Sequence, residues 1–240
     1  MQDFVEAAIS TLLVSPVRVI CAGRTDAGVH ARAQVVHLDT EVDRNENAWV
    51  RGVNAHLPAD IRVIWAKRLP DQAEIPVEDP FHARYSAYSR TYQYLLLNDP
   101  VGAGLHTGRV GWFHMPLDVE QMQAAAACLI GEQDFSAFRS AECQAKTPVK
   151  TVHHAELSKR DALIVLDIRA SAFLHHMVRN IVGCLVYIGA GRQDVAWFKQ
   201  LIAAGDRAQC APTFAPDGLY LAGVEYAPHW NLPAFRQRTD

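Results

Sequence analysis

The sequence lacks the features that identify membrane and secreted proteins. Within its 240 residues no apolar run approaches the roughly 20 residues that a membrane-spanning helix needs. Met1 is followed by polar and acidic residues instead of the basic start of a secretory signal. We therefore expect a cytoplasmic protein that has no membrane partner.

Cysteines are few and widely spaced. The number of cysteines is odd, and no two have the short spacing of a zinc knuckle: Cys21, Cys128, Cys143, Cys184 and Cys210. This pattern argues against a disulfide framework and against a cysteine-based metal site.

Histidine is more abundant, but its spacing does not predict a metal site either. The chain has 11 histidines and no His-Glu-x-x-His arrangement. His153-His154 and His175-His176 are adjacent pairs, and adjacent residues of a helix or strand point to different faces. We expect no metal and no cofactor, and a histidine-based metallohydrolase is the weakest functional hypothesis.

The sequence also lacks an excess of positive charge. Its formal net charge is −3, which argues against non-specific binding of nucleic acid by the whole surface. A local basic groove remains open, because seven scattered cations could line one: Arg24, Arg32, Arg84, Arg90, Lys146, Lys150 and Arg179.

Hydrophobic periodicity predicts helices and strands in irregular alternation. Helices are expected at residues 4–12, 49–53, 119–130, 173–188 and 195–204. Strands are expected at residues 17–22, 33–40, 62–69, 89–98, 109–114, 152–159, 162–170 and 219–226. Hairpin-type pairing without regular βαβ units indicates an α+β fold with mainly antiparallel sheets. We place a domain boundary after the proline-punctuated connection 70–80, giving an N-terminal domain 1–80 and a C-terminal domain 81–240.

One acidic turn follows the first expected strand. Gly23 to Ala31 reads Gly-Arg-Thr-Asp-Ala-Gly-Val-His-Ala, so Asp26 lies on a turn that Gly23 and Gly28 permit. From these residues alone, an ordinary hairpin connection is the better explanation, because Asp and Gly are common turn formers.

Further segments give this turn a context. The nonapeptide resembles the signature of the tRNA pseudouridine synthase A family, and other segments resemble that family in the same order. They are Arg51-Gly-Val-Asn-Ala-His-Leu-Pro58, Phe81-His-Ala-Arg84, Arg90-Thr-Tyr-Gln-Tyr94, Gly131-Glu-Gln-Asp-Phe-Ser-Ala-Phe138, Ala172-Phe-Leu-His-His-Met-Val-Arg-Asn-Ile-Val-Gly183 and Gly218-Leu-Tyr-Leu221.

The resemblance implies two α/β-sandwich-like halves whose sheets meet at a central catalytic cleft. It implies a homodimer that isomerises uridine to pseudouridine at positions 38 to 40 of the tRNA anticodon stem-loop, with Asp26 as nucleophile. Attack at C6 of the base and attack at C1′ of the sugar are both open.

The chemistry adds a requirement of its own. Shielding from water favours the neutral form of a carboxyl group, and an adjacent cation favours the charged form. Asp26 therefore needs a cationic partner. The resemblance places the segment of Arg179 beside the nucleophile, so we expect an Asp26–Arg179 ion pair.

The resemblance also assigns the substrate contacts. Tyr92 is expected to stack on the flipped uracil and to take the C5 proton. Arg24 would fill the vacated base stack or hold a phosphate. Leu219 or Leu221 would form an apolar wall. A solvent-exposed arginine and plain core residues are the competing interpretations.

The chain departs from the family at its start. Family members open with a strand carrying a Tyr-Asp-Gly…Gly-Trp-Gln motif, which this sequence lacks, and Met1 to Ile9 match the helix that follows it. The alternative hypothesis is therefore a truncated, inactive form that binds tRNA or dimerises.

Overall fold

The computed structural model describes residues 1–69 and 80–233, which divide into two compact units. Of these residues, the first unit contains 1–24, 34–69, 80–87 and 226–233, and the second contains 25–33 and 88–225. The turn that carries Asp26 thus packs with the second unit. The connection expected at 70–80 lies, except for its last residue, outside the described residues, so the sequence-based domain boundary stays a prediction.

The first unit is built around two helices. Helix α1 (Gln2–Leu13) packs against α2 (Glu46–His56), and strands β1 (Ile20–Cys21) and β3 (Val36–His37) pair antiparallel. The Asn45 side chain caps α2 by accepting a hydrogen bond from Ala48 N, so α2 is longer than expected. A small core consists of Ala8, Ile9, Val19, Val53 and Leu57.

The prediction of a strand at residues 62–69 is wrong. This segment has no strand partner among the described residues. The side chain of Asn54 satisfies its backbone instead, accepting from Val63 N and donating to Val63 O at 2.8 Å each. A side-chain amide thereby replaces the neighbouring strand that the apolar pattern suggested.

The second unit contains a mixed seven-stranded sheet in the order β2-β9-β4-β8-β7-β6, with β5 paired to β4. Its strands are β2 (His30–Ala31), β4 (Ala87–Asn98), β5 (Gly111–Phe113), β6 (Gly131–Asp134), β7 (Val149–Arg160), β8 (Leu163–Ala170) and β9 (Leu219–Tyr226). The pairs β4–β8, β7–β8 and β6–β7 are antiparallel, whereas β2–β9 and β4–β5 are parallel. With the helices, this confirms the α+β class.

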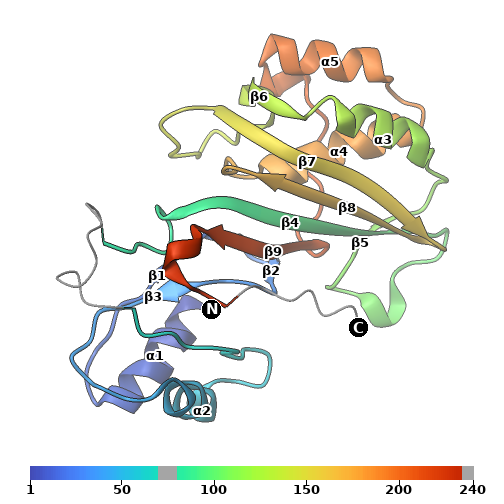
Figure 1. Ribbon diagram of the computed structural model, residues 1–240. Coiled ribbons are helices and arrows are strands. Elements are labelled where there is room, and N and C mark those ends of the chain that lie inside the picture. Colours follow the sequence, from blue (N-terminus) through green and yellow to red (C-terminus); the bar gives the residue numbers. More distant parts are fainter. Residues whose placement is uncertain (70–79, 234–240) are drawn as a thin grey trace. The chain divides into compact units, whose positions relative to one another are not determined.

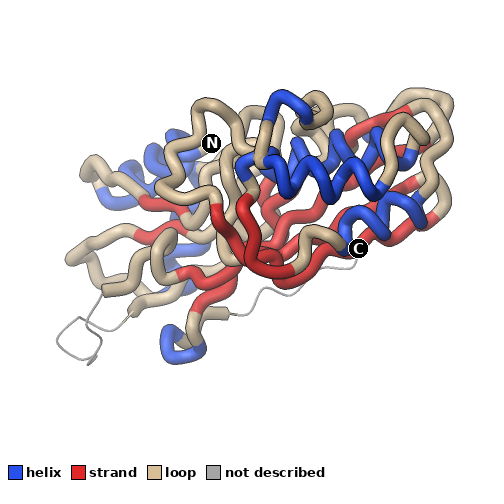
Figure 2. Tube along the Cα trace, turned by 90° about the horizontal axis from the view of Figure 1, so that it is seen from above, coloured by secondary structure: helices blue, strands red, loops and turns tan. Residues whose placement is uncertain are grey.

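Three helices cover one face of this sheet: α3 (Val119–Ala127), α4 (Met177–Gly189) and α5 (Val195–Ala204) (Figures 1 and 2). The burial pattern of strand β8 agrees with a sheet covered on one face, because its buried and half-buried residues alternate with the strand period of two. The buried positions Ile164, Leu166 and Ile168 join the main core with Ile181 and Leu185 of α4. Short 3₁₀ turns lie at Gly104–His106, Ser136–Phe138, Arg207–Gln209 and Pro228–Trp230.

Local signals located several of these elements. The β7–β8 hairpin is confirmed, with Asp161 of its turn at φ 53°. Asp118 and Asp194 cap α3 and α5 as expected, each through its side chain. The helix expected from residue 173 instead begins at Met177, after His176 in the left-handed region. No helix in the described part of the chain has the length and apolarity to cross a membrane.

Candidate active site

The centre of the site is the carboxylate of Asp26, which has three nitrogen partners. Its Oδ2 atom lies 3.0 Å from Arg179 Nη1 and 3.2 Å from His176 Nε2, and its Oδ1 atom lies 3.2 Å from His175 Nε2. The Asp26 side chain is 26% exposed and that of Arg179 is 14% exposed. The ion pair that the sequence chemistry required is therefore present, in a partly water-shielded position.

A tight turn presents this carboxylate. Val29 N donates to Asp26 O at 3.1 Å, and Gly28 has φ +81°, as position i+2 of a type II turn requires. A Cβ at Gly28 would also lie 2.9 Å from Pro216 Cγ, so both conformation and space select glycine. Gly23, in contrast, is not among the glycines with positive φ.

The histidine pair precedes helix α4. His176 occupies the N-cap position at φ 62°, and Met177 N donates to Leu174 O in the turn before it. The backbone of His175 is fixed on both sides, because its N–H donates to Cys143 Sγ and its C=O accepts from Ser140 N. With the backbone reversed at His176, both imidazoles reach Asp26, and their centroids lie 4.0 Å apart.

Arg179 lies within the first turn of α4 and is anchored at two points. Its Nε donates to Phe214 O at 2.9 Å, and its backbone C=O accepts from Phe214 N at 3.2 Å. One edge of the guanidinium is thus fixed by the loop before β9, while Nη1 faces the carboxylate. Such a planar, always charged group suits a fixed ion pair.

Burial lowers the pKa of His176 below its ordinary value of 6.5. The charge of Asp26 opposes this effect, and the neighbouring His175 and Arg179 add to it. A neutral imidazole that carries its hydrogen on Nε2 can still donate a hydrogen bond to the carboxylate.

Tyr92 lies on β4 with its ring 5.0 Å from that of Phe173, in an edge-to-face arrangement. It is partly buried and packs against the main core, and Tyr94 on the same strand face is fully buried, donating from its hydroxyl to Ala215 O. Because Phe173 lies two residues before His175, Tyr92 contacts the segment that carries the histidines. Its role toward uracil stays a prediction.

The remaining expected contacts divide between core and surface. Leu219 and Leu221 of β9 are buried, at 6% and 0% exposure, and Leu219 belongs to the main core. Arg24 is exposed and has no hydrogen bond or ion pair with any other described residue. The binding roles of these three residues stay predictions.

His175 and His176 are the site residues that the sequence reasoning missed. The argument that adjacent histidines do not share a face fails here, because they precede the helix and His176 has a left-handed backbone. The only hint in the sequence was their place four and three residues before Arg179 in one resembling segment. Together with Asp26 they offer three metal-ligating atoms within 4.8 Å of one another.

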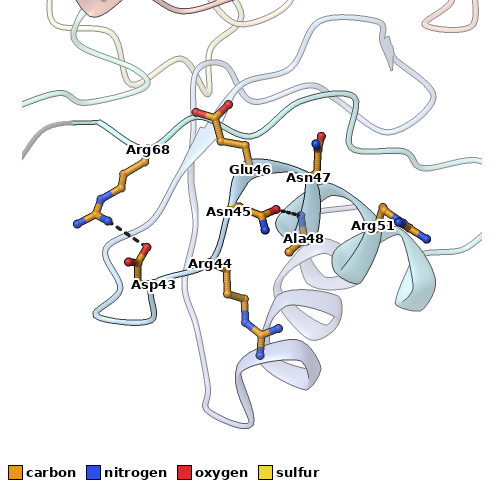
Figure 3. A pocket seen from close by; sticks show the side chains of 8 residues that line it. All are labelled: Asp43, Arg44, Asn45, Glu46, Asn47, Ala48, Arg51 and Arg68. Atoms are coloured by element: carbon orange, nitrogen blue, oxygen red, sulfur yellow. Dashed lines mark hydrogen bonds and ion pairs between the residues drawn. The ribbon is translucent and has the colours of Figure 1, made fainter.

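A second charged region lies in the first unit, as an open groove at the start of α2 (Figure 3). It is lined by Asp43, Arg44, Asn45, Glu46, Asn47, Ala48, Arg51 and Arg68. Arg68 Nη1 pairs with Asp43 Oδ1 at 3.0 Å, and these side chains are 68% and 78% exposed. Both signs of charge face the groove, so it does not form a uniformly basic surface.

Known proteins resemble this chain closely. Residues 125–227 match the family model described as tRNA pseudouridine synthase. The chain is 56% identical over 233 residues to tRNA pseudouridine synthase A of Dechloromonas aromatica, covering 97% of this chain and 86% of that protein. It is 53% identical to the same-named protein of Methylobacillus flagellatus, covering 99% and 88%, and 55% identical to that of Aromatoleum aromaticum, covering 97% and 85%.

Proposed function

This chain belongs to the tRNA pseudouridine synthase A family, and from that membership we propose that it converts uridine to pseudouridine at positions 38 to 40 of the tRNA anticodon stem-loop, with Asp26 as the nucleophile. The enzyme is an isomerase. The bond between C1′ and N1 breaks, the uracil turns, and C1′ bonds to C5. The C5 proton is lost and N1 gains one, so the reaction balances without oxidant or net hydrolysis.

The contact between Asp26 and Arg179 carries this proposal. A nucleophilic carboxylate must be charged and shielded from water that would hydrolyse the intermediate. Arg179 Nη1 places a positive charge 3.0 Å from Asp26 Oδ2, and the Asp26 side chain is only 26% exposed. A free lone pair of the Asp26 carboxylate can attack either C6 of the base or C1′ of the sugar. Both routes need the carboxylate in its charged form.

His175 and His176 act as positioning residues for Asp26. Each imidazole lies 3.2 Å from a different carboxylate oxygen, so the pair restricts rotation of the carboxylate. Orientation of this kind places an attacking atom near its target before the reaction begins.

Substrate contacts complete the proposal. Tyr92 stacks on the flipped uracil and takes the C5 proton, and Leu219 and Leu221 supply the apolar wall of the pocket. Arg24, which is exposed, fills the vacated stack or holds a phosphate. We further propose a cytoplasmic homodimer, with both subunits contacting one tRNA.

The test is an incubation of the chain with an anticodon stem-loop RNA, followed by carbodiimide labelling and mass mapping of pseudouridine. We expect label at uridines 38, 39 or 40 with wild-type protein and none with Asp26→Asn, while both proteins retain the RNA in a gel-shift assay. Pseudouridine formation by Asp26→Asn would overturn the assignment of the nucleophile. RNA retention without isomerisation by wild-type protein would instead support a binding form.

A further inference from the structure

We propose that Asp26, His175 and His176 form a binding site for a divalent transition-metal ion such as Zn²⁺, and that the bound ion inhibits the enzyme. The proposal goes beyond the isomerase reaction, which needs no metal. The ion would occupy the carboxylate on which the proposed chemistry depends.

The donor set supports this inference. Two imidazole nitrogens and one carboxylate oxygen converge within 4.8 Å, which is a combination that suits Zn²⁺, Co²⁺ and Ni²⁺. The site has a single carboxylate, and Arg179 pairs with it at 3.0 Å, so little net negative charge is left for a hard cation. We therefore expect no competition from Mg²⁺, which prefers oxygen ligands and several waters.

The spacing of the ligand atoms fits as well. Zinc–ligand distances of about 2.0–2.1 Å place two ligands of a tetrahedral ion about 3.3 Å apart. Each imidazole Nε2 atom lies 3.2 Å from a different oxygen of Asp26, and the three ligand atoms lie within 4.8 Å of one another. An ion bound by one oxygen of Asp26 and both imidazoles would bring these ligand atoms to its own spacing through rotations of their side chains.

The cluster is accessible yet held in place. The side chains of Asp26, His175 and His176 are 26%, 33% and 27% exposed, which leaves a path for an ion and room for bound water. The backbone of His175 is fixed to Cys143 and Ser140, and the turn of Asp26 by Gly28. Ligands fixed in this way lose little freedom when the ion binds.

Zinc titration of the metal-stripped full chain, monitored by calorimetry, tests the site. We expect one Zn²⁺ per chain for wild-type protein, and affinity at least about tenfold weaker in His175→Ala, His176→Ala and Asp26→Asn. His154→Ala is the control, because this imidazole lies near two carboxylates, Glu156 and Asp167, outside the cluster. It should bind like wild type.

Circular dichroism identifies any variant that fails to fold. If a histidine variant fails, the comparison with wild type relies on Asp26→Asn, which keeps the shape of the side chain. Equal zinc affinity in wild type and the folded cluster variants, or no stoichiometric binding by wild type, would overturn the site. In the isomerase assay, Zn²⁺ should inhibit wild type and His154→Ala, a chelator should restore both, and excess Mg²⁺ should have no effect. Binding is read without RNA, so the site and the proposed function fail separately.

Discussion

Two arginine–carboxylate pairs in this molecule have the same length and different surroundings. Arg179 and Asp26 lie 3.0 Å apart in the second unit, and Arg68 and Asp43 lie 3.0 Å apart in the first. The side chains of Arg179 and Asp26 are 14% and 26% exposed, whereas those of Arg68 and Asp43 are 68% and 78% exposed. Water and salt screen the attraction in the exposed pair more strongly than in the partly shielded pair.

Distance alone therefore does not identify a functional ion pair. The groove at α2 is open to solvent, and both acidic and basic side chains line it (Figure 3). Asp26, in contrast, has three nitrogen partners and a turn whose conformation requires glycine. The two regions therefore differ in how many partners converge on the carboxylate and in how far the carboxylate is shielded from solvent.

The largest difference is expected when each aspartate is replaced. Asp26→Asn should lower the rate of pseudouridine formation on the order of 10⁴-fold or more, because an amide does not replace the nucleophile. Asp43→Asn should leave kcat within about twofold of wild type, because exposed pairs contribute little. Single-turnover assays on a stem-loop RNA measure both rates. Comparable losses in the two variants would remove the distinction between the pairs.

Replacement of the arginines should give a smaller difference. Arg179→Gln should reduce kcat about 10²- to 10³-fold, the size seen when one positioned electrostatic partner is removed. Arg68→Gln is the matched control and should change kcat by no more than about twofold. Steady-state kinetics separate kcat from KM, and an effect of Arg179→Gln on KM alone would point to RNA binding as its role.

The turn that presents Asp26 has no counterpart at Asp43, and a glycine replacement tests it. Gly28→Ala should destabilise the protein by about 1–2 kcal/mol, because alanine is strained at positive φ and its Cβ would crowd Pro216 at 2.9 Å. Gly102→Ala is the control, since a Cβ there has open space. Urea denaturation followed by circular dichroism measures both. Equal stability of the two variants would contradict the conformational requirement.

The smallest expected effect is a pH dependence confined to the first unit. Partial burial lowers the pKa of His37 below 6.5, and the neighbouring His82 adds to this effect. The Nδ1 atom of His37 accepts a hydrogen bond from Ala83 N at 3.1 Å, which requires the unprotonated nitrogen. Because the unfolded state binds this proton more readily, the stabilisation is present above pH 6.5 and is lost as the pH falls through the lowered value.

Hydrogen exchange of the Ala83 amide checks this prediction. Its protection should fall between about pH 7 and pH 5 in wild-type protein. His37→Asn keeps an acceptor near Nδ1 and removes the titration, so its protection should vary less over the same range. Parallel pH profiles would show that His37 does not control the contact.

The sequence predicted those parts of the fold that depend on neighbouring residues. Apolar spacing located α1, and the aspartate caps located α3 and α5. The strand at 62–69 failed because its partner is the side chain of Asn54 in another element, which no local pattern records. The predicted start of α4 was wrong because His176 adopts a left-handed backbone, which is uncommon for residues other than glycine.

The same distinction applies to the site. A general requirement for a cation beside a shielded carboxylate, together with the resemblance, predicted the contact between Asp26 and Arg179. The two histidines escaped prediction because their approach to Asp26 depends on where α4 begins. An error of a few residues in a helix start was enough to hide two members of the cluster.

The loop between the 3₁₀ turn Arg207–Gln209 and β9 supports both sides of the central ion pair. Phe214 holds Arg179 through two hydrogen bonds, and Pro216, two residues later, lies against Gly28 in the turn of Asp26. Because the same loop contacts both residues, a displacement of the loop would move the carboxylate and the guanidinium in the same direction. Motions of this loop should therefore change the distance between the carboxylate and the guanidinium little.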